Sequence, residues 1–87
     1  IYFNIFMTPQ EIEEELSFIN EQALLADGFH EALLGIDVVD YIAVYDYEKC
    51  IDVLIRQGME EDAAIEYMDH NVLGAKMGEY TPRYVKI

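Results

Sequence analysis

Tryptophan is absent from this 87-residue chain, and cysteine occurs once, at Cys50. A single cysteine excludes an internal disulfide and is typical of a reducing compartment. Acidic residues interrupt the apolar sequence every few positions, so no stretch reaches the roughly 20 apolar residues that span a bilayer. Residues 1–6 lack the basic region of a secretory signal. We therefore expect an intracellular, cytoplasmic protein without a membrane segment.

Recognisable catalytic signatures are also missing. The five glycines are isolated, which excludes the glycine-rich loops that bind nucleotide phosphates. Cys50 lies on an expected helical stripe, where a free cysteine usually behaves as a small apolar side chain. Glu66 and His70 are one helical turn apart, but two adjacent ligands do not make a metal site. We expect no catalytic residue, no cofactor and no metal, and a small metal-dependent enzyme is the weakest alternative.

Basic residues are scarce, because five Lys and Arg stand against 18 Asp and Glu, for a net charge of −13. Residues 1–48 contain eleven acids and no Lys or Arg, whereas residues 49–87 contain seven acids and five bases. Such a field repels nucleic acid and anionic membranes and attracts basic protein surfaces. The charge either directs a partner or only maintains solubility, although it exceeds the magnitude of about 2–8 that solubility of a small domain requires.

The remaining composition is that of a folded protein, with 53% hydrophobic and 13% aromatic residues. This content separates the chain from disordered acidic tails, and its length suits one domain. Met7 precedes a helix-start pattern and has the character of a natural first residue. We therefore expect a single domain over residues 7–87. Residues 1–6 are either an artificial extension or an edge strand, since Tyr, Phe and Ile favour strands.

The segment after Met7 has the pattern of a capped helix. Thr8, Pro9 and Glu11 match a capping box with proline at the first helical position. Apolar residues at helical spacing then predict a helix over about 9–25, ended by Asp27-Gly28. Phe18 and Leu25 lie off the apolar stripe, and we expect packing under a neighbouring element rather than a binding patch.

Two short apolar runs, 32–36 and 41–45, are separated by the polar break 37–40 and predict a hairpin. The strand prediction for the first run is the weaker of the two, because the beginning of this run also fits a helical turn. Asp46 has the position of an N-cap for a second helix over about 47–57.

The rest of the chain predicts a third helix and a closing strand. Acids near residue 60 favour a helix start, and the apolar spacing continues to about residue 72. Residues 81–87 fit a strand whose Pro82 favours an edge or strand-start position. The fold class expected is α+β, with three helices and a small antiparallel sheet of about three strands.

Seven tyrosines are the most unusual neutral feature of the sequence. Tyrosine is favoured at interfaces, because its ring buries apolar area while its hydroxyl keeps a hydrogen-bond partner. We expect Tyr45 and Tyr67 to fill the edge of the core, and the placement of Tyr80 and Tyr84 is left open.

Several short segments share a pattern with known proteins: AVYDYEKCI at 43–51, GM at 58–59, AIEY at 64–67, NVLGA at 71–75, GE at 78–79 and TP at 81–82. Over residues 8–87 the chain resembles small uncharacterised proteins of bacteriophages and prophages. The resemblance brings no catalytic residue. It implies a phage setting, in which short acidic proteins act as anti-CRISPR-type inhibitors of host defence by occupying a basic surface that binds nucleic acid.

These observations lead to one principal hypothesis and one alternative. The principal hypothesis is a non-enzymatic phage inhibitor in the host cytoplasm, whose carboxylates imitate the phosphates that basic proteins bind. The expected acidic face consists of Glu11, Glu13, Glu14, Glu21, Asp27 and Glu31. The alternative is a small assembly protein that forms a homo-oligomer through apolar residues such as Phe18, Leu25 and Tyr84.

Overall fold

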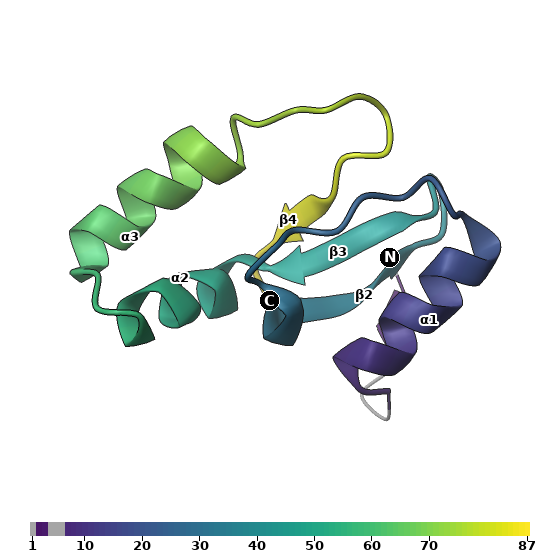
Figure 1. The fold of residues 1–87 in the computed structure, drawn as a ribbon, viewed down its shortest axis with the longest axis horizontal. Helices are drawn as coiled ribbons and strands as arrows, with labels where there is room; N and C mark the ends of the chain where they lie inside the picture. Colours follow the sequence, from purple (N-terminus) through teal and green to yellow (C-terminus); the bar gives the residue numbers. More distant parts are fainter. Residues whose placement is uncertain (1, 4–6) are drawn as a thin grey trace.

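The computed structural model describes residues 2–3 and 7–87, which form an α+β fold around one mixed sheet (Figure 1). The strands, in their order in the sheet, are β1 (Tyr2–Phe3), β2 (Leu33–Asp37), β3 (Ile42–Asp46) and β4 (Arg83–Val85). The first two pairings are antiparallel, but β4 pairs with β3 in parallel. The expected wholly antiparallel sheet is therefore wrong, because two helices and a long connection separate β3 from β4 and return the chain to the same end of the sheet.

The N-terminal segment contributes the edge strand β1. Tyr2 pairs with Ile36 and Phe3 pairs with Gly35. The other residues of the segment, 1 and 4–6, lie outside the described residues, so the expectation of an edge strand is met over two residues only.

Helix α1 (Pro9–Ile19) begins where the sequence predicts but ends earlier. The capping box is confirmed, since Glu11 N donates to the Thr8 hydroxyl at 3.2 Å and Thr8 N donates to Glu11 Oε1 at 2.8 Å. The expected end near residue 25 is wrong, because Asn20 leaves the helical conformation and its side chain donates to Tyr41 O at 2.7 Å. That long-range bond replaces a further helical turn.

The chain between α1 and β2 crosses the sheet as an irregular segment (Figure 1). Leu24 N donates to Tyr80 O at 3.1 Å, and Ala26 N donates to the Tyr45 hydroxyl at 2.8 Å. Gly28 adopts a φ of 89°, which glycine takes without a Cβ clash. A 3₁₀ turn, η1 (His30–Ala32), then leads into β2.

The second and third helices form a hairpin at the end of the sheet opposite α1 (Figure 1). Helix α2 (Tyr47–Arg56) confirms the prediction, with Asp46 accepting a hydrogen bond from Lys49 N at 3.2 Å. Helix α3 (Glu61–Tyr67) continues into a π-helical turn, η2 (Met68–Val72), so the expected end at about residue 72 is also confirmed.

The core lies between the sheet and the helices. Its largest fully buried side chains are Tyr45, Leu16, Met68, Val44 and Cys50. The Tyr45 ring stacks on the Tyr84 ring with 5.6 Å between centroids. The expected packing of Tyr45 is confirmed, and Tyr67 is 40% exposed. Helix α3 buries only Ala64, so Tyr67 remains on its open side.

Candidate protein interface

The six carboxylates of the expected acidic face lie on three consecutive segments of the chain. Glu11, Glu13 and Glu14 lie on α1, Glu21 and Asp27 on the crossing segment, and Glu31 on η1. Glu13 Oε2 is 3.2 Å from His30 Nδ1, and Glu31 Oε1 is 2.7 Å from Arg56 Nη2. Two members of the expected acidic face therefore lie beside basic side chains of other elements, and the role of this face in binding stays a prediction.

Two further members have local partners on α1. Hydrogen bonds from the Thr8 backbone and hydroxyl lower the pKa of the Glu11 carboxyl, which belongs to the capping box. Glu14 Oε2 accepts from Gln10 Nε2 at 3.3 Å, on the outer side of the helix. Glu21 and Asp27 form no ion pair with residues 7–87. These two, and Glu11 and Glu14 with their hydrogen bonds from neutral groups, are the members without a basic partner among residues 7–87.

Exposed apolar side chains lie on two elements at the end of the molecule where α1 finishes. These elements are the last turn of α1 and the turn between β2 and β3. We call this surface the end patch, and its members are Phe18, Ile19, Val38, Val39 and Tyr41. Phe18 is 90% exposed and Val39 is 79% exposed, so the expectation that Phe18 packs under a neighbouring element is wrong. Because α1 ends at Ile19, no later helical turn covers the Phe18 ring.

The two elements of the end patch are held together by specific bonds. The Asn20 side chain links the end of α1 to the Tyr41 carbonyl. In the turn itself, Asp37 Oδ1 accepts from Val39 N at 2.8 Å and from Asp40 N at 3.4 Å. The exposed apolar side chains are therefore displayed on a turn with a defined shape.

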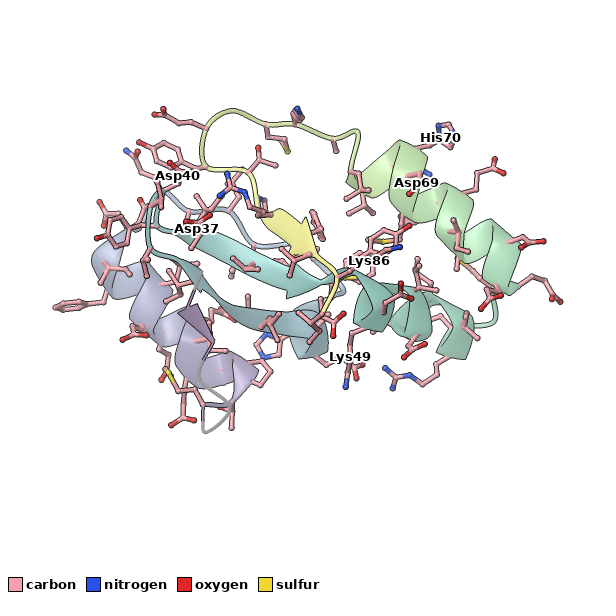
Figure 2. The ribbon with its side chains drawn as sticks, turned by 180° about the vertical axis from the view of Figure 1, so that it is seen from behind. Asp37, Asp40, Lys49, Asp69, His70 and Lys86 are labelled. Atoms are coloured by element: carbon pink, nitrogen blue, oxygen red, sulfur yellow. The ribbon has the colours of Figure 1, made fainter. Side chains whose placement is uncertain are left out.

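A buried carboxylate anchors the same turn to β4. Asp37 is the buried charged residue of the described core, and its Oδ2 pairs with Arg83 Nη1. Arg83 Nη2 also contacts Asp40 Oδ2 at 3.1 Å. Figure 2 shows Asp37 and Asp40 close together at this end of the sheet. Strand β4, the turn and the end patch are thereby coupled through one guanidinium group.

Tyr41 is held in an unfavourable backbone conformation. Its φ of 54° makes it the one non-glycine residue with positive φ in the described chain. A bulky residue in the left-handed region costs roughly 1–2 kcal/mol. Tyr41 is 48% exposed. Positive φ is found in the loops of β-hairpins, where glycine usually takes it, and also at functional sites.

Replacing Tyr41 with glycine is expected to raise the free energy of unfolding by up to about 1 kcal/mol, because glycine accepts positive φ without a Cβ clash. Urea unfolding followed by circular dichroism would measure the change. Tyr41→Ala retains the strain and serves as the control. A Tyr41→Gly protein less stable than Tyr41→Ala would contradict the assignment of strain.

Acidic side chains flank the end patch. Glu15 and Glu14 precede Phe18 by three and four residues, a spacing that places them beside it on a helix. Glu21 follows in the turn after α1. The surface therefore offers apolar area next to carboxylates, and it contains members that the sequence interpretation missed. Val38 and Val39 were assigned to a polar break, although adjacent valines between two aspartates were a visible signal of an apolar turn.

The groups considered for catalysis are poorly placed for it. Burial, followed by the nearby Asp46 carboxylate, raises the pKa of the Cys50 thiol to about 12. The thiolate, which is the nucleophile, is therefore scarce at neutral pH. In the parts of the chain that the structure describes, no group of three or more His, Cys, Asp or Glu side chains is arranged to hold a metal ion.

Comparison with protein families, curated proteins and solved structures finds no match to this chain. None of the described helices is both long and apolar enough to cross a bilayer.

Proposed function

We propose that this protein is a non-enzymatic binding module that docks the end patch on a protein surface that is basic and partly apolar. The observation that carries the proposal is the exposure of five apolar side chains, one of them on a residue with positive φ, on two elements that Asn20 joins. Contiguous exposed apolar area with a polar rim marks interaction sites. Aromatic side chains such as Phe18 and Tyr41 are common interface anchors.

The charge of the chain supports a basic partner. Three of the five basic side chains pair with carboxylates of the described chain, namely Arg56, Arg83 and Lys86. Because the chain has 18 Asp and Glu residues, most of its carboxylates remain without a compensating positive charge. A net charge of −13 therefore creates a negative field around the end patch. This field would accelerate encounter with a basic surface in a salt-dependent manner and disfavour acidic surfaces.

The narrower form of the proposal is an anti-CRISPR-type inhibitor that a phage produces in the cytoplasm of its host. The partner is then a defence protein whose basic surface binds nucleic acid. The carboxylates beside the end patch occupy the positions on the partner that nucleic-acid phosphates would occupy; these are Glu14, Glu15 and Glu21. The end patch supplies apolar contacts that a phosphate backbone lacks. Support comes from the charge distribution and from the resemblance to phage proteins.

Self-association is a second candidate, because Phe18 is 90% exposed. Two copies meeting at the end patch would bring like charges together, which costs free energy unless salt screens them. Sedimentation at raised ionic strength distinguishes the candidates. A dimer that appears there and is lost in Phe18→Ser would favour self-association.

The basic character of the partner is tested by reversing two charges beside the end patch. We expect Glu14→Lys/Glu21→Lys to retain about tenfold less of a partner captured from bacterial lysate at low salt, and the difference should shrink at high salt. Quantitative mass spectrometry of the retained protein measures the effect. Asp52→Lys/Glu66→Lys makes the same change in net charge on α2 and α3. Equal losses from both variants would show that only total charge matters and would contradict docking at the end patch.

A further inference from the structure

A second apolar surface lies away from the end patch, between the crossing segment and the chain that follows α3. Figure 1 shows the crossing segment in front of the sheet and the later chain arching from α3 towards β4. Between them is a groove with a volume of about 240 Å³. Its walls are Leu24, Leu25, Ala26, Asp27, Phe29, Tyr67, Asn71, Val72, Ala75, Met77, Thr81, Pro82 and Tyr84.

The walls of the groove are fixed by bonds and packing. The crossing segment is held by the hydrogen bonds of Leu24 N to Tyr80 O and of Ala26 N to the Tyr45 hydroxyl. Phe29 is buried in the core, and Tyr84 stacks on the Tyr45 ring. The open side carries Tyr67 and Met77, whose side chains are exposed. The groove is thus largely preformed, with a lining in which apolar side chains predominate.

Asp27 is the charged residue among those walls. It is exposed and makes no ion pair with residues 7–87. Burial, and then the neighbouring Cys50 and Tyr45, raise the pKa of the Tyr84 hydroxyl to about 12, so this phenol stays neutral. A ligand of the groove therefore meets mainly apolar and aromatic side chains, together with the polar side chains of Asn71 and Thr81 and one carboxylate. Such a site favours an apolar body next to a cation.

The size of the groove indicates what kind of apolar body fits. A cavity of about 150 Å³ accommodates benzene, whereas pockets for drug-sized ligands occupy about 300–1,000 Å³. The groove, at about 240 Å³, lies between them. It suits one large side chain of a protein segment better than a whole cofactor.

We propose that the groove binds a segment of the partner protein by enclosing a large apolar side chain, while Asp27 pairs with an adjacent Lys or Arg of that segment. This inference rests on the proposed function, because it assumes a protein partner with basic character. It adds a second contact, separate from the end patch, and it names the residue types that the partner presents. The negative net charge of the chain favours the same segment.

The proposal is tested by titrating the ¹⁵N-labelled full chain with Ac-Phe-Lys-NH₂ and following amide shifts by NMR. We expect weak, saturable binding, with the largest shifts at Leu25, Asp27 and Val72. Asp27→Asn should weaken binding about three- to fivefold, the range of an exposed ion pair. Asp62→Asn, which removes an exposed carboxylate from α3 outside the groove, should leave binding unchanged.

A second variant and two other ligands complete the test. Ala75→Trp places a large ring in the groove and should abolish the peptide-induced shifts. The other amide signals of this variant should keep the dispersion of a folded protein. Ac-Phe-Glu-NH₂ should bind more weakly than the lysine peptide. Equal binding of the two peptides, or shifts confined to the end patch, would overturn the proposal. So would binding of phenethylamine without binding of Ac-Phe-Lys-NH₂, which would indicate a small-molecule site. The titration needs no knowledge of the natural partner, so its failure is distinguishable from failure of the lysate capture.

Discussion

Replacing Asp37 with alanine is expected to lower the free energy of unfolding by about 2–4 kcal/mol. The substitution removes the buried partner of Arg83 and the acceptor for Val39 N and Asp40 N. It therefore disrupts both the β2–β3 turn and the attachment of β4. Because Arg83 is half-exposed, solvent already screens part of its charge, which keeps the expected cost below that of a fully buried pair. The loss is a large share of the roughly 5–15 kcal/mol that stabilises a small domain.

Urea unfolding followed by circular dichroism measures this effect. Asp52→Ala is the matched control, since Asp52 is exposed on α2 and should change stability by no more than about 0.5 kcal/mol. The double variant Asp37→Ala/Arg83→Ala should be more stable than the sum of the two single changes predicts, because the residues interact directly. If Asp37→Ala differed from the control by less than 1 kcal/mol, the anchoring role of the buried carboxylate would be wrong.

The double substitution Phe18→Ser/Val39→Ser is expected to weaken partner binding by about 100-fold or more. Two buried interface anchors, each contributing about 1–2 kcal/mol or more, give a loss of this size. Both side chains are largely exposed in the isolated chain, so the free energy of unfolding should change by no more than about 0.5 kcal/mol. A binding loss without a stability loss is the signature of an interface residue. The measurement is titration calorimetry with the captured partner, alongside urea unfolding.

Ile87→Ser provides the control for that experiment, because Ile87 is 77% exposed and lies at the opposite end of the sequence. It should leave affinity unchanged within about twofold. If the double variant bound the partner as tightly as Ile87→Ser does, the end patch would not be the docking surface. Phe18 and Val39 would then be exposed without a role in binding.

Local signals in the sequence predicted the helix starts well. Thr8, Pro9 and Glu11 specify a capping box that needs only their own neighbours to form, and Asp46 caps α2 in the same way. The hairpin was also predictable, since two apolar runs flank a short break. Each of these features depends on residues a few positions apart in the sequence. Such residues are also close together in the folded chain, so the sequence alone indicates their contacts.

Long-range contacts account for most of the wrong predictions. Helix α1 ends at Ile19 because Asn20 bonds to Tyr41, a partner 21 residues away. Glu13 and Glu31 have His30 and Arg56 beside them in the fold, which their places in the sequence do not indicate. The parallel pairing of β4 depends on how two helices return the chain. These partners lie far apart in the sequence, so no pattern of neighbouring residues indicates the contacts.

The sequence by itself determined the α+β class, the helix starts and the negative field, because these follow from local hydrogen bonding, apolar periodicity and the sum of charges. Only the tertiary structure decided which acids remain available and where apolar side chains gather. The end patch joins the last turn of α1 to a turn some 20 residues later, and the groove joins segments from both halves of the chain. Such surfaces exist only once packing has placed distant segments side by side, and packing depends on the whole chain at once.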